Sequence, residues 1–589
     1  MNREPYLTLR DFRVWFAKRR GFLESLRRTE PAYVKAVDGI DLDVGKGEVF
    51  CLVGESGCGK TTTGKGILGL VPPTGGDVFV NVPAEELSRY AKAKGDADEA
   101  TLEAFRRRYS LSYEEKAVWK MKDVLLFLLA TAAGFVVSGL LGAGVAVGIQ
   151  GTLGSGWLFL AFLLSGAVLG FMGTLPFVKA ANRVPAYLAL TALLGTQGMF
   201  LFFLTFLRVT QGKPTDLGSV FGDFGSAWGR DFVQILVQVA YALIGALAAW
   251  QSAKVFTGYW QSKKGIETDR FRKLRKTLQI IFQDPYESLN PKHSVYDIVA
   301  EPLIVNHITR RRAETEARVE RALEDAGLRP PRDFMFRYPH ELSGGQRQRV
   351  SIAGALVLDP DFLVADEPVS MLDVSIRTEI VELLLELRKR KGLTYLFITH
   401  DLSLAWVIAD RIGVMYLGKM VEEGPKEQVV RNPRHPYTKA LITVVPVPDP
   451  DRRHQRTILK GERPDPSDIP AGCRFHPRCP VAFEACGWEA HELLDDLKEL
   501  ALASGREPKF LASLAVDGPL SLFLPWDSSE AETWLREQMA ARAEEYRSLK
   551  AIRSIEKANG GLRILLHEGR EPILKSVAPN VRVACHLAG

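Results

Sequence analysis

The hydrophobic residues of this chain are concentrated in one central block. Four apolar stretches lie between residues 122 and 257, each about 19 to 26 residues long and without an internal charge: 124–149, 157–178, 184–207 and 232–250. At 1.5 Å per residue, a helix of that length crosses a hydrocarbon core of about 30 Å. Buried helices of a soluble domain normally keep a polar face. The pattern therefore predicts four transmembrane helices.

Charges at the ends of this block predict its orientation. Lysines and arginines gather before the first stretch, between the second and third, and after the fourth. By the positive-inside rule these ends face the cytosol. Four crossings return the chain to its starting side, so the parts flanking the block share one compartment. We therefore expect a multi-pass protein of the cell membrane whose other parts lie on the cytoplasmic side, with no secretory signal at the N-terminus.

A glycine-rich loop follows a short apolar strand, 48–53, near the N-terminus. The loop satisfies the pattern GxxxxGK[ST] and comprises Gly54, Glu55, Ser56, Gly57, Cys58, Gly59, Lys60 and Thr61, with Thr62 next. In such a P-loop the backbone N–H groups converge on phosphates at a helix N-terminus. The lysine reaches the β- and γ-phosphates, and the hydroxyl can ligate Mg²⁺. The sequence therefore predicts a site for ATP and Mg²⁺.

A second apolar strand, 362–365, ends in two carboxylates, Asp366 and Glu367. We expect Asp366 to hold the hydration shell of Mg²⁺ and Glu367 to polarise the attacking water. A solvated strand end often carries such residues without function, so the context decides. Three further elements supply it: Gln283 after an apolar run, Leu-Ser-Gly-Gly-Gln at 342–346 before a helical stretch, and His400 at the end of an apolar strand.

These motifs, in this order, resemble the ATPases of ABC transporters. The resemblance implies an α/β P-loop ABC ATPase domain, with a mixed-sheet core and a helical subdomain, that hydrolyses ATP as a dimer. Part of the site would come from the second ATPase subunit, whose signature sequence closes over the γ-phosphate: Ser343, Gly344, Gly345 and Gln346.

The same resemblance implies roles for four further residues. Gln283 would sense Mg²⁺ and the attacking water, His400 would contact the γ-phosphate, and Asp373 would lie at the dimer interface. Phe16 would stack on the adenine, with Trp15 and Tyr33 as rivals for that role.

Three longer runs, 282–291, 414–418 and 432–441, resemble more narrowly the oligopeptide and dipeptide importer ATPases. This resemblance implies separate membrane permease subunits, an extracytoplasmic solute-binding protein, and import of peptides or a related solute. The apolar block departs from the family, because it enters the antiparallel sheet that precedes Gln283. Since its spans hold no ionisable residue of a transport pathway, we expect the block to anchor the ATPase in membrane lipid beside the permeases.

Four of the six cysteines lie in the C-terminal part of the chain: Cys473, Cys479, Cys486 and Cys585. Grouped thiolates in a cytosolic protein indicate a metal site rather than disulfides. Their spacing is not that of a zinc ribbon. The importer resemblance implies a four-iron four-sulfur cluster, 4Fe-4S, at these positions, and zinc or free thiols are the alternatives. Cys51 and Cys58 are expected to be small packing residues.

The chain is thus expected to have five parts: 1–82, the first part of the ATPase domain; 83–121, a charged, partly helical stalk; 122–257, the membrane insertion; 258–430, the second part of the ATPase domain; and 431–589, a C-terminal domain with the cysteine cluster and a helical insertion at about 487–575. The net charge of +6 is mild for 589 residues, and it favours a phosphate-binding or membrane-facing surface over a nucleic-acid binder. Two alternatives stay open: a homodimeric half-transporter that uses its own four helices as the pathway, and a DNA-acting ABC ATPase.

Overall fold

The computed structural model describes residues 4–18, 33–112, 274, 276–444, 459, 461–505, 515–525, 528–558 and 560–588. The four predicted membrane stretches lie outside these ranges. Within them, no helix is both long and apolar enough to cross a bilayer. The four-helix insertion therefore stays a prediction.

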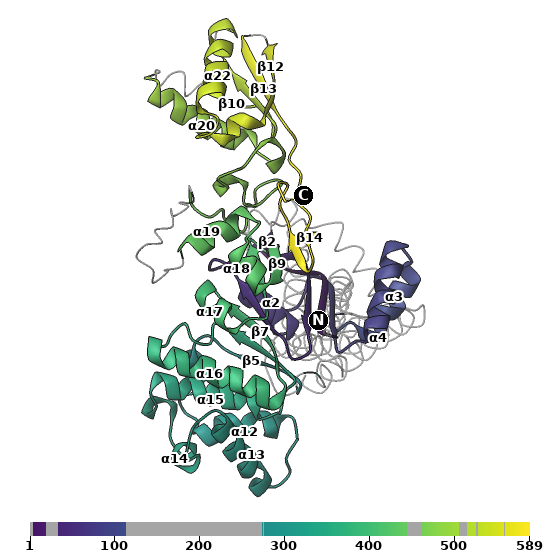
Figure 1. Ribbon diagram of the computed structural model, residues 1–589, viewed down its shortest axis with the longest axis vertical. Helices are drawn as coiled ribbons and strands as arrows, with labels where there is room; N and C mark the ends of the chain where they lie inside the picture. Colours follow the sequence, from purple (N-terminus) through teal and green to yellow (C-terminus); the bar gives the residue numbers. More distant parts are fainter. Residues whose placement is uncertain are drawn as a thin grey trace, which may run out of the picture. The chain divides into compact units, whose positions relative to one another are not determined.

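An eight-stranded mixed sheet forms the centre of the ATPase part (Figure 1), in the order β14-β15-β9-β8-β3-β7-β6-β5. Its parallel strands are β3 (Val49–Val53), β5 (Leu278–Ile281), β6 (Phe362–Asp366), β7 (Thr394–Thr399) and β8 (Arg411–Tyr416). All residues of β3, β6 and β7 are buried, as expected for parallel strands covered on both faces. The antiparallel strands are β9 (Lys419–Pro425), β14 (Lys575–Ala578) and β15 (Val581–Val583).

A second sheet is antiparallel and has the order β2-β1-β4. Its strands are β1 (Pro5–Ala17), β2 (Tyr33–Gly45) and β4 (Gly75–Val80). Along β2, buried and partly exposed residues alternate, which is the pattern of a strand with one face on the core. Inward residues of β1 and β2 share a hydrophobic core with β3 and with helix α2 (Lys60–Ile67), so this sheet helps to support the glycine-rich loop.

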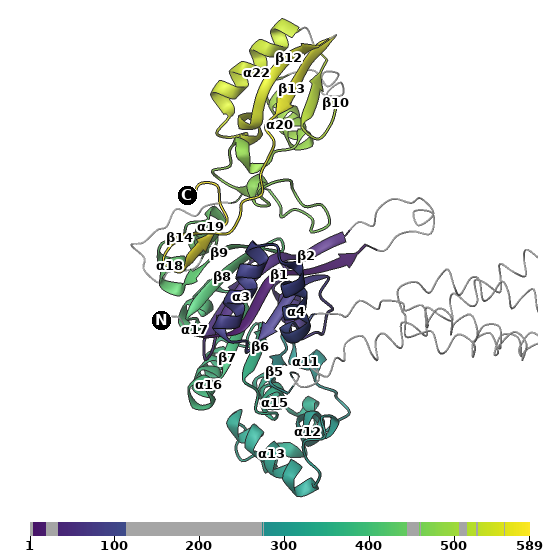
Figure 2. The same cartoon turned by 90° about the vertical axis from the view of Figure 1, so that its right-hand side faces the viewer.

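The predicted stalk contains two helices, α3 (Ala84–Gly95) and α4 (Glu99–Tyr109), which lie side by side in Figure 2. They pack on β4 through an aromatic cluster in which the rings of Phe79 and Phe105 meet edge to face at 5.3 Å. Asp77 of β4 accepts hydrogen bonds from Tyr90 and Arg106. The expected helical character is confirmed, and these helices are docked on the sheet rather than free of it.

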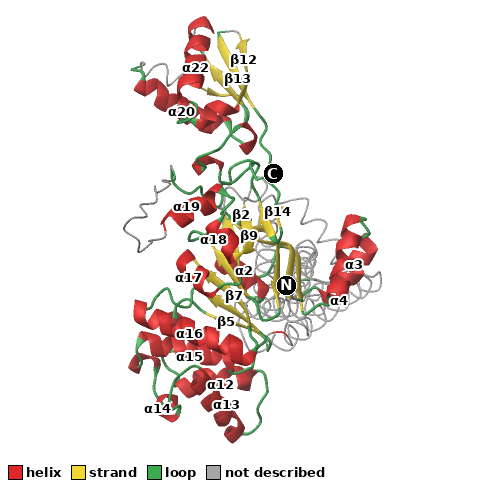
Figure 3. Cartoon of the chain, in the orientation of Figure 1, coloured by secondary structure: helices red, strands yellow, loops and turns green. Residues whose placement is uncertain are grey.

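A helical subdomain follows β5, coloured red in Figure 3. It comprises α11 (Pro285–Ser288), α12 (Val295–Val305), α13 (Arg312–Asp325), α14 (Arg332–Met335) and α15 (Gly344–Leu356). Ser294 caps α12 through a capping box with Asp297. The ATPase part continues with α16 (Val374–Lys391), α17 (Leu402–Ile408), α18 (Lys426–Arg431) and α19 (Pro436–Val444). The expected mixed sheet with a helical subdomain is confirmed.

The insertion at 487–575 is not purely helical, which corrects the expectation from sequence. Helices α20 (Ala490–Ala503) and α22 (Ser528–Arg542) accompany a four-stranded antiparallel sheet, β10-β11-β13-β12. Its strands are β10 (Ala515–Val516), β11 (Ser521–Leu524), β12 (Ile552–Ala558) and β13 (Gly561–Leu566). The Asn-Gly sequence at 559–560 is a typical hairpin signal, and Gly560 has φ 84°, so the chain turns there instead of continuing a helix.

The end of the chain returns to the ATPase sheet. In β15, Arg582 and Val583 pair with Glu423 and Glu422 of β9. The boundary expected at 430 therefore does not separate two independent folds, because strands on either side of it share one sheet.

Candidate active site

Four adjacent parallel strands end at one edge of the central sheet, in the order β3-β7-β6-β5. The segments that follow them carry Lys60 and Thr61, His400, Glu367 and Gln283, and Asp366 is the last residue of β6. Carboxyl ends of parallel strands are the usual place for ligands in α/β folds. The predicted catalytic residues thus reach one place from parts of the chain far apart in sequence.

The P-loop connects β3 to α2 through a backbone that requires glycine. Gly54, Gly57 and Gly59 have φ values of 159°, 75° and 108°. A Cβ on Gly59 would lie 2.1 Å from the carbonyl oxygen of Ala36, so a larger residue does not fit. Lys60 is buried, and its Nζ donates to the carbonyl oxygens of Gly54 (2.8 Å) and Glu55 (3.0 Å). The lysine is held against the loop that would receive the phosphates.

Two of the three residues predicted to bind Mg²⁺, namely Thr61, Gln283 and Asp366, are hydrogen-bonded to each other. The Thr61 hydroxyl donates to Asp366 Oδ1 at 2.8 Å. Burial raises the pKa of Asp366, and the hydrogen bond from Thr61 opposes that shift. A hydroxyl and a carboxylate oxygen placed together are hard ligands of the kind that Mg²⁺ prefers, so these residues fit the ion.

The Glu367 side chain contacts the side chains of the other two predicted catalytic residues. Its Oε2 accepts from Gln283 Nε2 at 3.1 Å and lies 3.1 Å from Nδ1 of His400. The backbone at Glu367 is left-handed, with φ 46°, and its N–H donates to the carbonyl of Ile398 in β7. Such a conformation is uncommon for a non-glycine residue. It is often found at functional sites, where the surrounding structure holds the backbone in place.

The signature residues form the start of α15. Ser343 is the N-cap, its hydroxyl accepts from the Gln346 N–H, and the Gln346 side chain accepts from the Ser343 N–H. Gly345 has no room for a side chain, because a Cβ there would lie 2.6 Å from Ile376. Ser343 is exposed, and so is Asp373, which begins α16. An exposed helix N-terminus suits an anion presented from outside the subunit.

The residues considered for adenine stacking lie at the ends of β1 and β2. Phe16 and Tyr33 are 44% and 40% exposed, so both rings are open to solvent. Trp15 is engaged instead, because its indole N–H donates to Asp38 and its ring lies 5.1 Å from the Lys35 ammonium. The assignment of Phe16 stays a prediction, and the geometry leaves Tyr33 as its rival.

Two residues near the P-loop were not identified from the sequence. The Tyr437 hydroxyl accepts from the backbone N–H of Glu55 at 2.9 Å. Arg478 donates to both carboxylate oxygens of Glu55, at 2.9 and 3.1 Å. Tyr437 lies in the 432–441 run, and Arg478 adjoins Cys479. Their positions in these two motifs were the only sequence features that pointed to them, and neither motif indicates a contact with the P-loop.

The four C-terminal cysteines are neighbours in the structure. The Cys473 N–H donates to the Cys486 carbonyl at 2.8 Å. Burial, together with the smaller effect of the nearby thiols of Cys486, Cys479 and Cys585, raises the pKa of Cys473 to about 12. In the described ranges, no three histidine, cysteine or acidic side chains converge on a position for one metal ion. As expected, Cys51 and Cys58 are buried packing residues.

Comparisons with known proteins place these motifs in a family. Residues 37–126 and 245–370 match the ABC transporter family. Residues 421–486 match the C-terminal region of the oligopeptide/dipeptide transporter family, and this match includes three of the four clustered cysteines.

Two relatives are closely similar over the ATPase part. The putative oligopeptide transport ATP-binding protein YkfD of Bacillus subtilis is 52% identical over 223 residues, 38% of this chain and 67% of the relative. The oligopeptide transport ATP-binding protein OppF of Escherichia coli is 45% identical over 249 residues, 42% of this chain and 73% of the relative.

Among solved structures, CbiO1 of Clostridium perfringens, part of an ABC transporter complex, aligns with a TM-score of 0.35 at 17% identity, covering 73% of this chain and 92% of that one. A likeness at that level carries no weight beside the sequence matches. The identity to YkfD and OppF extends over at least two thirds of each, so the chain belongs to the ATP-binding subunits of ABC transporters, in the oligopeptide/dipeptide importer family.

Proposed function

We propose that this ABC ATPase binds and hydrolyses Mg²⁺-ATP to drive the import of oligopeptides or dipeptides through separate permease subunits. The observation that carries the proposal is the junction at the end of β6. There the P-loop hydroxyl of Thr61 bonds to Asp366, and the adjacent Glu367 contacts both Gln283 and His400. The peptide cargo follows from the names of the relatives, which describe peptide transport.

Each residue of the junction has a role that its position permits. Lys60 would exchange its two loop carbonyls for phosphate oxygens, which are stronger acceptors. Thr61 and Asp366 would hold Mg²⁺, which when bound would offset the negative charge of the phosphates. Glu367 would then accept a hydrogen bond from the attacking water, while Gln283 and His400 fix the carboxylate in place.

The proposed active form is a dimer. The signature turn of Ser343 to Gln346 is a helix N-terminus that begins at the exposed Ser343, and its backbone donors could face a phosphate bound to the second ATPase subunit. The exposed Asp373 would lie at the same interface. This arrangement predicts that hydrolysis depends on protein concentration.

We further propose that the four cysteines hold a 4Fe-4S cluster. In a four-iron cluster each thiolate binds a different iron, so the sulfurs are neighbours without converging on one point. A single zinc ion would instead require the four sulfurs around one centre. The thiols of Cys473, Cys479, Cys486 and Cys585 lie near enough to influence one another, and four neighbouring thiolates are the ligands that such a cluster takes.

The remaining parts of the proposal concern the membrane. Residues 122–257 would anchor the subunit in the cell membrane as a multi-pass segment in contact with lipid, with the ATPase on the cytoplasmic side. An extracytoplasmic solute-binding protein would deliver the peptide to the permeases. The exposed Phe16 would complete the nucleotide site by stacking on the adenine.

Affinity purification from native membranes tests this proposal. We expect the chain to hydrolyse Mg²⁺-ATP and to co-elute with hydrophobic permease subunits, and peptide should stimulate hydrolysis once the solute-binding protein is added. Hydrolysis by the chain alone, with transport in vesicles that contain no other protein, would favour the homodimeric half-transporter instead. Absence of both nucleotide binding and hydrolysis would refute the proposal.

A further inference from the structure

The C-terminal part of the chain from residue 431 onward, called here the cysteine-bearing segment, contacts the P-loop at three points. Arg478 donates to both oxygens of the Glu55 carboxylate, at 2.9 and 3.1 Å. Tyr437 accepts from the Glu55 backbone N–H at 2.9 Å. Arg463 donates to the carbonyl oxygen of Ser56. Two successive residues of the phosphate-binding loop are therefore held by residues that lie outside the nucleotide-binding motifs.

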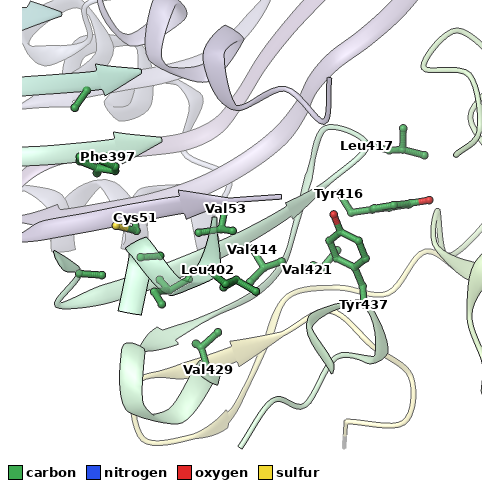
Figure 4. Close-up of a cluster of buried hydrophobic side chains, with 14 of the residues drawn as sticks. Cys51, Val53, Phe397, Leu402, Val414, Tyr416, Leu417, Val421, Val429 and Tyr437 are labelled. Carbon is green, nitrogen blue, oxygen red and sulfur yellow. The ribbon is translucent and has the colours of Figure 1, made fainter. Parts of the chain in front are cut away.

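These contacts are built into the fold. The Arg478 side chain is only 11% exposed, and its guanidinium also reaches the Tyr416 hydroxyl. Tyr437 is fully buried, and its ring centre lies 4.8 Å from that of Tyr416 and 5.3 Å from that of Phe475. Figure 4 shows the Tyr416 and Tyr437 side chains next to each other. Burial raises the pKa of Tyr437, so its hydroxyl stays neutral and can accept the Glu55 N–H at any physiological pH.

Glu55 is the link between this support and the site. Its backbone carbonyl accepts a hydrogen bond from Lys60, the residue expected to bind the phosphates. Its backbone N–H and its carboxylate are fixed by Tyr437 and Arg478. Displacement of Glu55 would therefore move both the loop backbone and the lysine.

We propose that Arg478 and Tyr437 are positioning residues for the P-loop, and that through them the cysteine-bearing segment sets the affinity for ATP. The proposal rests on the proposed function. Arg478 directly precedes Cys479, so a change at the cysteines reaches the loop through one ion pair. In a loop that samples several conformations, the apparent dissociation constant rises in inverse proportion to the fraction of molecules whose loop is competent to bind.

The effect of removing the ion pair is expected in affinity rather than in turnover. Without Arg478 the carboxylate loses a partly buried, charge-assisted partner, and we expect the dissociation constant for ATP to rise roughly 3- to 30-fold. Saturating ATP selects the competent loop, so kcat should stay within about twofold of the wild type. A purely structural role would lower the folded fraction and leave the affinity of the folded protein unchanged.

The experiment compares four full-length proteins by binding of a fluorescent ATP analogue, by KM and kcat, and by thermal unfolding. They are the wild type, R478Q, R478K and the control R582Q. Arg582 is also an arginine of the C-terminal part that pairs with a glutamate of the ATPase sheet, Glu423 at 2.8 Å, and it also donates to the carbonyl oxygen of Asp41, which lies outside the P-loop. We expect weaker binding in R478Q, partial rescue in R478K, and wild-type affinity in R582Q.

A double-mutant cycle completes the test. E55Q should weaken binding to a similar extent, and E55Q combined with R478Q should add little, because both remove the same ion pair. Equal affinity in R478Q and the wild type would overturn the inference while leaving the ATPase assignment intact. Loss of binding in the wild type and in R582Q would instead refute the proposed function.

Discussion

Replacement of Glu367 by glutamine is the most direct test of the catalytic assignment. Both contacts of the Glu367 side chain, from Gln283 and His400, are made to the same oxygen, Oε2. A glutamine amide oxygen can occupy that position, and the substitution keeps the size of the side chain. The variant therefore removes the negative charge with little change in geometry.

The magnitude follows from the role. Loss of a general base typically lowers the rate about 10²- to 10⁴-fold, which corresponds to about 2.7 to 5.4 kcal/mol of lost transition-state stabilisation. The effect on folding should be far smaller, because two charge-assisted hydrogen bonds become neutral ones at a partly solvated position, a cost of about 1 kcal/mol. We expect ATP affinity within about threefold of the wild type, since Lys60 and Thr61 are unchanged.

The assay is steady-state ATP hydrolysis at saturating Mg²⁺-ATP, with nucleotide binding and thermal unfolding measured on the same preparation. E379Q is a matched control, because Glu379 is a half-exposed carboxylate on α16 that pairs with Arg349 away from the junction. Turnover of E367Q equal to that of E379Q would refute the assignment of Glu367. If E367Q fails to bind nucleotide while E379Q still binds it, Glu367 acts in nucleotide binding instead.

Three further predictions concern the loop, the signature helix and pH. G59A places a Cβ 2.1 Å from the Ala36 carbonyl at a residue with φ 108°, so binding of the ATP analogue should fall by at least about tenfold; unchanged affinity would contradict this. S343A removes the cap on Gln346 and should lower the free energy of unfolding by about 1 kcal/mol in urea titrations; wild-type stability would contradict it. Burial lowers the pKa of His435 to about 3. As the pH falls below 6.5, the imidazole therefore becomes protonated in the unfolded chain but stays neutral in the folded one. The free energy of unfolding should then decrease by about 1.4 kcal/mol for each unit by which the pH falls. H435N keeps a side-chain acceptor for the Tyr437 N–H but cannot be protonated. It should therefore remove this contribution to the dependence of the free energy of unfolding on pH, and an unchanged dependence would contradict the prediction.

The local structure of the predicted nucleotide site could be foreseen from sequence because it depends on short motifs. Gly54 to Thr61 follow a strand and begin a helix, as the pattern requires, and Ser343 caps α15 as its sequence context predicts. The convergence of Asp366 with Thr61 was also predictable, since strands ending at one sheet edge bring such residues together.

Other features depend on contacts that no local pattern contains. The Glu55–Arg478 pair joins residues 423 positions apart, so only the folded chain brings them together. The 552–558 segment lies in a longer charged run whose pattern favours a helix, but it forms strand β12. Ile552 and Ile555 lie in this strand, which pairs with β13. The turn at Gly560 connects the two strands. The Asn-Gly signal was present and outweighs the charge pattern.

The flanks of both long insertions remain tied to the folded part of the chain that each insertion interrupts. Leu111, before the first insertion, bonds through its N–H to Val78 and shares a hydrophobic core with Leu278 on the other side. At the second insertion, the Arg570 N–H donates to the Ala485 carbonyl, one residue before Cys486. An insertion whose ends meet replaces a surface turn without displacing what it interrupts. The return of the chain beside Cys486 also explains how Cys585, 99 positions later in the sequence, remains a neighbour of the other three thiols.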